Sequence, residues 1–159
     1  MNRLVAYLIR FAVILVGYGV ASLAASAFLN IMFLASLGLM TDETQPVAQA
    51  SLWFSVPFVA LFVAYFAFMP AAVAILVSEI LGRRDWLFYA LAGAAVAAVF
   101  LGFVRQTKDA NFEITNTSVM LAVIGCGMVG GIFYWLSAGR SAGSWRQIGR
   151  PISPGPSGS

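Results

Sequence analysis

Four long apolar stretches, separated by short polar breaks, make up most of this chain. A bilayer core about 30 Å thick requires about 20 apolar residues of helix to cross it, and each stretch meets or approaches that length. The sequence therefore predicts an all-α integral membrane protein with four transmembrane helices. Their expected ranges are about 6–38, 50–81, 86–104 and 118–136.

Composition limits the chain to one domain. Of its 159 residues 61% are hydrophobic and 9% are charged, too few polar groups to cover a water-soluble globule. No loop is long enough to hold a soluble domain with its own core. We therefore expect one transmembrane domain over residues 1–138. Residues 139–159 are rich in Gly, Ser, Pro and Arg, which predicts a disordered cytoplasmic tail.

The basic residues predict an orientation. With four crossings, the termini and the short turn at 82–85 share one side, and the helices form two antiparallel hairpins. That side carries Arg3, Arg10, Arg83, Arg84, Arg140, Arg146 and Arg150. The opposite side carries only Arg105 and Lys108. The positive-inside rule then predicts cytoplasmic N- and C-termini, and we expect a multi-pass protein of a bacterial inner (plasma) membrane.

The first apolar stretch also has features of a signal peptide. Arg3 precedes it, and Ala25, Ser26 and Ala27 form a small-residue pattern typical of a cleavage site. However, the apolar run continues to Met40, whereas the apolar region of a signal peptide spans about 7–15 residues. We therefore expect an uncleaved first helix.

The second helix contains Pro57 and Pro70. Each proline lacks a backbone donor and crowds the carbonyl four residues earlier, which predicts two kinks. The same helix carries Phe54, Phe58 and Phe62 at intervals of four. We expect these rings to face lipid, and the alternative is an aromatic-lined pocket for an apolar ligand.

Small residues recur at helical spacing in every predicted helix. Small side chains allow close backbone approach, which holds helices together where lipid removes any hydrophobic driving force. The expected packing residues are Gly127, Gly131, Ala60, Ala64, Ala67, Ala71, Ala74, Ala94 and Ala98. We interpret them as contacts within one chain. The alternative is a homodimer contact through the fourth helix.

Polar and charged side chains inside the predicted helices are few. Tyr18, Ser22, Ser26 and Asn30 lie four apart on one face of the first helix, which predicts hydrogen bonds between helices or, alternatively, a polar path. Glu79 lies four residues before Arg83, a spacing that favours an ion pair. The arginines expected to contact anionic lipid headgroups are Arg10, Arg83, Arg84, Arg140 and Arg146.

The sequence contains no histidine and one cysteine, Cys126. This composition argues against histidine-ligated haem or zinc sites and against a thiolate metal cluster. No motif pairs a nucleophile with a base, so we expect neither an enzyme nor a cofactor. The basic residues flank apolar helices, which points to lipid rather than to nucleic acid.

Three functions remain open at this point. The first is a non-enzymatic accessory subunit or membrane scaffold, within a homodimer or a larger membrane complex. The second is a small oligomeric transporter or channel that uses the Tyr18–Asn30 face. The third is a membrane sensor that binds anionic lipids through its arginines.

Overall fold

The computed structural model describes residues 3–38, 45–106 and 117–142. Within these residues the chain is all-helical. Its helices are α1 (Arg3–Ser36), α2 (Gln45–Leu81), α3 (Trp86–Gln106), α4 (Thr117–Ser137) and the short 3₁₀ helix η1 (Gly139–Ser141). Four of them are long and apolar enough to span a membrane, as the sequence predicted. Both α1 and α2 begin several residues earlier than expected.

The four long helices differ in length. The 21 residues of α3 and of α4 give about 30 Å of helix each, which matches one crossing of a bilayer core. The 34 residues of α1 give about 51 Å of helix and the 37 of α2 about 56 Å. Both α1 and α2 are therefore longer than a perpendicular crossing requires.

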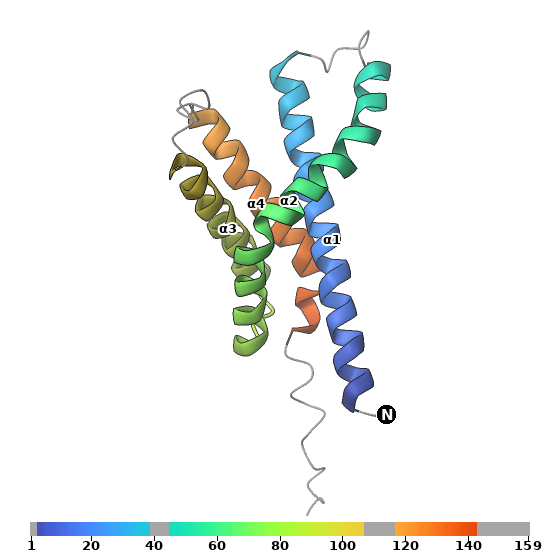
Figure 1. Ribbon diagram of the computed structural model, residues 1–159, viewed down its shortest axis with the longest axis vertical. Coiled ribbons are helices and arrows are strands. Elements are labelled where there is room, and N and C mark those ends of the chain that lie inside the picture. The colour runs from blue at the N-terminus through green and yellow to red at the C-terminus, as the bar shows by residue number, and fades with distance from the viewer. Residues whose placement is uncertain (1–2, 39–44, 107–116, 143–159) are drawn as a thin grey trace, which may run out of the picture.

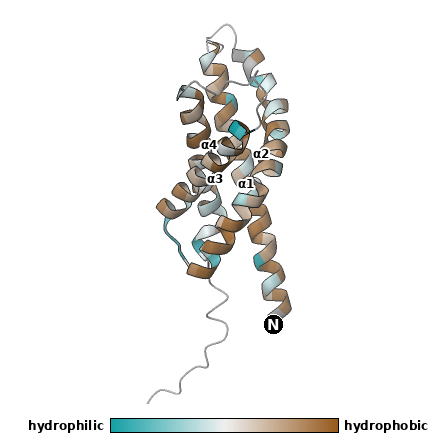
Figure 2. Cartoon of the chain, turned by 60° about the vertical axis from the view of Figure 1, so that its left-hand side comes forward, coloured by the Kyte–Doolittle hydropathy of each residue, from teal (hydrophilic) through white to brown (hydrophobic). Residues whose placement is uncertain are grey.

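Consecutive helices run in opposite directions (Figure 1). Helix α4 is central, because it packs against both α3 and α1, while α2 packs mainly on α1 and contacts α3 less. Apolar residues cover most of every helix (Figure 2). The few strongly buried side chains come mostly from small residues and from Tyr89 and Tyr134.

Helix α2 continues through both of its prolines, Pro57 and Pro70. Figure 1 shows that α2 changes direction along its length and crosses the front of the bundle obliquely. Proline removes one backbone hydrogen bond and crowds the preceding turn, so each position is a natural place for the helix to bend. Helix α2 is less closely packed on α3 than α4 is.

Glycines set the closest approach between α3 and α4. A Cβ atom added to Gly93 would collide with the carbonyl oxygen of Gly127, and one added to Gly131 would collide with that of Tyr89. A Cβ atom on Gly127 would lie 2.8 Å from the Cβ of Ala97. The backbones of α3 and α4 therefore meet through positions that tolerate no side chain.

The packing face of α3 differs from the expected one. Ala90, Ala97 and Leu101 are buried on it, and Gly93 faces Gly127. Ala98 is exposed, and Ala94 is only partly buried. The reason is that α3 offers two neighbouring rows of small residues, and the row that contains Gly93 admits the closer backbone contact.

The chain remains ordered into the range expected to be a disordered tail. Ala138 and Ala142 are 1% and 0% exposed, and η1 lies between them. Side chains of Arg10 and Arg84 donate to the carbonyl oxygens of Ala138 and Ala142, respectively. These contacts fix the first turn of the segment. Residues 143–159 lie outside the described residues.

Candidate functional site

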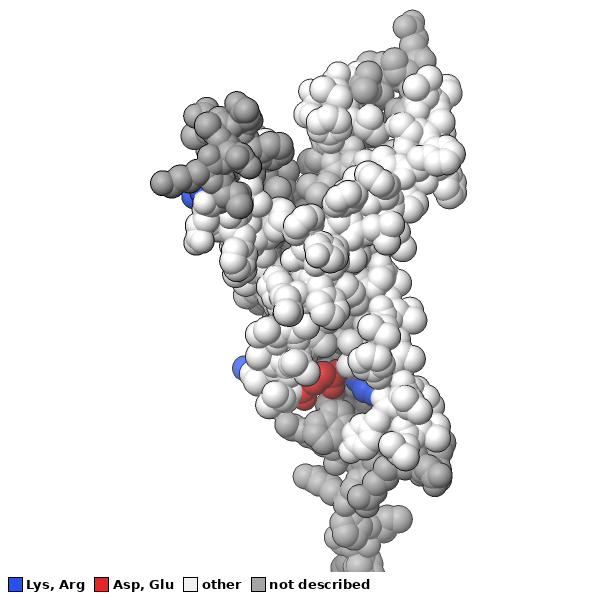
Figure 3. Space-filling model, viewed as in Figure 1, with Lys and Arg blue, Asp and Glu red and all other residues white. Residues whose placement is uncertain are grey.

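An ion pair joins α1 to α2 near the end of the bundle where η1 lies. Nη2 of Arg10 donates to Oε1 of Glu79, and both side chains are only 12% exposed. Nη1 of Arg10 also donates to Oγ of Ser141 at 2.6 Å and to the carbonyl oxygen of Ala138 at 3.4 Å. Arg10 therefore holds α1, α2 and the segment after α4 together. Figure 3 shows acidic and basic side chains meeting in a hollow in the lower part of the molecule.

This arrangement corrects two expectations for the charged residues. Glu79 pairs with Arg10, whereas Arg83 pairs with Asp85 at 3.4 Å. Arg10 was expected to reach lipid headgroups, but its guanidinium instead turns into the bundle. One sequence signal favoured the pair: both residues lie within apolar stretches, where ionisable side chains tend to find each other.

Arg83, Arg84 and Arg140 lie near the same end, whereas Arg105 lies at the other end of α3, where it donates to Sδ of Met120. Nε of Arg84 donates to the carbonyl oxygen of Ala142 at 3.1 Å, and the guanidinium of Arg140 stacks 4.6 Å above the ring of Trp135. The indole of Trp135 in turn donates to the carbonyl oxygen of Arg84 at 2.6 Å. Arg83 and Arg140 remain exposed. Arg146 lies outside the described residues.

The polar face of α1 bonds within the chain. Tyr18 donates to the carbonyl oxygen of Ala64 at 2.6 Å, and Ser26 donates to that of Val56 at 2.7 Å, so both reach α2. Ser22 and Asn30 donate to carbonyl oxygens of α1 itself, each at 2.9 Å. The face therefore combines bonds between helices with bonds inside one helix.

The small residues of α2 face the other helices. Ala60 is buried, and Ala67, Ala71 and Ala74 line a cavity between the helices. The aromatic side chains of α2 are mostly exposed, Phe54 by 84%, but Phe66 also contacts the ring of Phe100 on α3 and Phe68 contacts that of Tyr18 on α1. Gly127 and Gly131 of α4 pack against α3 of the same chain, so this row takes part in an intrachain contact.

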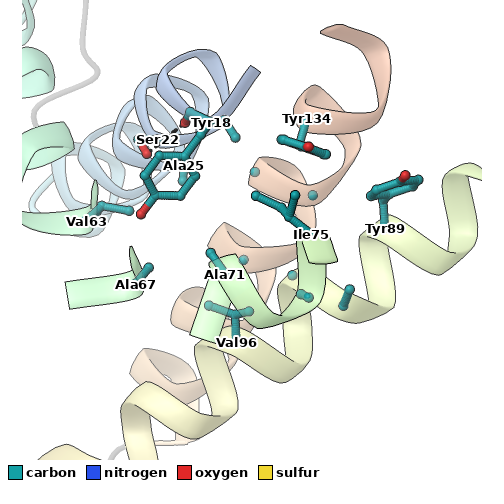
Figure 4. Close-up of a pocket in the computed structure, with 17 residues that line it drawn as sticks. Tyr18, Ser22, Ala25, Val63, Ala67, Ala71, Ile75, Tyr89, Val96 and Tyr134 are labelled. Carbon is teal, nitrogen blue, oxygen red and sulfur yellow. Dashed lines mark hydrogen bonds between the residues drawn. The ribbon is translucent and has the colours of Figure 1, made fainter. Parts of the chain in front are cut away.

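The cavity lies where all four long helices meet and measures about 110 Å³. Apart from three tyrosines and Ser22, its lining consists of Ala, Gly, Val and Ile side chains. Tyr89 and Tyr134 lie together, with ring centroids 5.6 Å apart, and Tyr18 lies away from them on α1 (Figure 4). A second apolar cavity of about 210 Å³ shares several lining residues: Ala25, Val63, Ala67, Val96 and Gly127.

The three tyrosines of the cavity differ in their hydroxyl partners. Tyr18 donates to Ala64, and Tyr89 donates to the carbonyl oxygen of Arg83 at 3.1 Å. The buried hydroxyl of Tyr134 has no hydrogen-bond partner among the described residues. Sequence reasoning missed Tyr89 and Tyr134, because an isolated tyrosine in an apolar helix has no spacing that distinguishes a buried position from an interfacial one.

The described residues contain no group of three His, Cys, Asp or Glu side chains that could hold a metal ion. Fold and site together define a helical protein with four candidate membrane spans, a buried interhelical ion pair and an apolar cavity. No family model, curated protein or solved structure matches the chain.

Proposed function

We propose that this chain is a multi-pass inner-membrane protein that acts as a non-enzymatic accessory subunit or scaffold. The observation that supports this function is the internal pairing of three polar side chains of α1. Tyr18 and Ser26 donate to α2 carbonyl oxygens, and Arg10 pairs with Glu79. Groups paired in this way hold helices together and are not presented to a substrate.

The partner surface in this proposal is the aromatic face of α2. Trp53, Phe54 and Tyr65 are 81%, 84% and 79% exposed, and they lie on one helix beside further exposed phenylalanines. Large rings supply much contact area at low cost in side-chain entropy, which suits a helix that packs on another membrane protein. A second copy of this chain could occupy the same surface.

Purification from the native membrane in a mild detergent tests this function. We expect a stoichiometric partner that mass spectrometry identifies in the wild-type preparation. The double variant Trp53→Leu/Phe54→Leu should lose this partner, while Phe11→Leu, at an exposed position of α1, should retain it. Wild-type protein that elutes alone and as a monomer would rule out the subunit function.

A transport function is the second candidate, because Tyr18 and Ser22 of the polar face line the central cavity. Single cysteines at Ser22, Ser26 and Asn30, in a Cys126→Ser background, test for water along this face with a membrane-impermeant thiol reagent. Cysteines at Leu23 and Leu29 are the controls. Protection of all five favours the accessory function, whereas labelling confined to the polar face favours transport.

Anionic lipid headgroups are the lipid partners that we propose for Arg83 and Arg140. Both side chains are exposed, and Arg140 lies over the ring of Trp135. Charge reversal at both positions should weaken binding to vesicles that contain anionic lipid. Binding to neutral vesicles should be unchanged.

A further inference from the structure

The central cavity has the size and lining of a binding site for a small apolar molecule. An apolar cavity of about 150 Å³ in another protein stays dry and binds benzene. Here a cavity of about 110 Å³ adjoins one of about 210 Å³, and the two share residues from all four helices. Together they offer room for a ring-sized group with a short apolar extension.

Tyr134 adds one polar group to this apolar space. The residue is 5% exposed, it lines the cavity, and its hydroxyl has no partner among the described residues. A buried hydroxyl without a hydrogen bond is costly, because it has lost its contacts with water. A ligand with an acceptor oxygen would restore this bond, so the cavity favours such a ligand over a pure hydrocarbon.

The charges nearby restrict the ligand further. Arg10 and Glu79 both lie close enough for their charges to act on Tyr134. Nε of Arg10 has no partner among the described residues, but Glu79 balances the charge of the guanidinium, so an anionic head group would face a carboxylate as well as a cation. The acceptor oxygen of the ligand is therefore neutral.

We propose that this cavity binds a neutral, lipid-soluble molecule whose carbonyl oxygen accepts a hydrogen bond from Tyr134 and whose apolar body lies among the small residues of the four helices. The side between α2 and α3 offers an entrance from the bilayer, since these two helices contact each other least of the neighbouring pairs. This binding site is independent of the partner surface on α2.

Three probes of similar size separate the contributions to binding. Acetophenone carries a neutral carbonyl, ethylbenzene lacks the acceptor, and benzoate is an anion. The purified full-length protein, labelled with 3-fluorotyrosine, reports on Tyr89 and Tyr134 by fluorine NMR. Acetophenone should shift both resonances saturably, at about fivefold lower concentration than ethylbenzene, while benzoate should shift neither.

Two pairs of variants assign the site. Tyr134→Phe should abolish the preference for acetophenone, read from the Tyr89 resonance, whereas Tyr7→Phe, at an exposed position, should preserve it. Ala71→Leu should block both acetophenone and ethylbenzene by filling the cavity. Ala72→Leu, on the same helix but outside the lining, should not.

Either of two results would overturn the proposal. Equal half-saturation for acetophenone and ethylbenzene in the wild type would mean that the cavity is an apolar void without a polar contact. Tighter binding of benzoate would mean that Arg10 acts as a free cation. The Ala71→Leu and Ala72→Leu pair keeps the test decisive even if Tyr134→Phe fails to fold.

Discussion

Arg10, in the third turn of α1, forms an ion pair with Glu79, in the last turn of α2, although 69 residues separate them. The same guanidinium reaches Ser141 and the carbonyl oxygen of Ala138 beyond α4. One side chain thus connects the first helix, the second helix and the segment after the fourth. Its neighbours on α3 and α4 are Tyr89 and Tyr134, whose rings contact each other at an angle of 36°.

Loss of one member of this pair should destabilise the protein strongly. Glu79→Leu leaves the guanidinium buried without its carboxylate, a change that costs about 3–5 kcal/mol in comparable buried pairs. The double variant Arg10→Leu/Glu79→Leu removes both charges and should recover most of this loss. Asp85→Leu, at the exposed pair with Arg83, should cost less than about 1 kcal/mol.

Thermal unfolding in detergent measures all three variants. The expected order of midpoints places Glu79→Leu lowest, with the double variant and Asp85→Leu well above it. A double variant that is less stable than Glu79→Leu would contradict this prediction. It would show that the other contacts of Arg10 stabilise the fold by more than its unpaired charge costs.

The α3–α4 contact should not tolerate a side chain at its glycines. Gly127→Leu or Gly131→Leu places new atoms against α3 backbone carbonyls, and overpacking of this kind costs about 1–3 kcal/mol or more. Gly102→Leu is the matched control, because nothing lies within 4 Å of a Cβ atom added there. The difference in unfolding midpoint between Gly127→Leu and Gly102→Leu checks the contact. Equal midpoints would place the close approach elsewhere.

The count of arginine and lysine residues predicts the membrane topology. Alkaline phosphatase fused after residue 45 or 110 should be active, because these positions lie outside the cytoplasm. A fluorescent protein fused after residue 84 or 144 should fluoresce, because these positions lie inside it. Alkaline phosphatase and a fluorescent protein give opposite readouts at each position. A fusion after residue 84 that is active outside would contradict the proposed orientation.

Tyr18 and Tyr134 should respond in opposite ways to loss of the hydroxyl. Tyr18→Phe removes a bond between α1 and α2, at a cost of about 0.6–1.7 kcal/mol. Tyr134→Phe removes a buried hydroxyl that has no partner among the described residues, so the ligand-free protein should keep its stability or gain about 1 kcal/mol. Unfolding midpoints in detergent, measured without added ligand, compare the two. A clear loss for Tyr134→Phe would reveal a hydrogen bond at this hydroxyl.

The sequence alone predicted the elements of this fold, because their causes are local. Each apolar stretch is long enough to form one membrane-spanning helix, and that helix satisfies its own backbone hydrogen bonds. The four predicted helices agree with α1 to α4. The prolines of α2 likewise act on their own turn. The early start of α2 was missed, since its first residues include Gln45 and Gln49 and give only a weak apolar signal.

The tertiary structure decided which faces and which charges meet. On α3, two rows consist of equally small side chains in the sequence: Ala90–Ala94–Ala98 and Ala90–Gly93–Ala97. The position of Gly127 on α4 selects the second row as the contact. Glu79 had an arginine one turn away, yet its partner is Arg10 on α1. Helix formation depends on neighbours along the chain, whereas these pairings depend on distances between helices, which hydropathy and spacing do not encode.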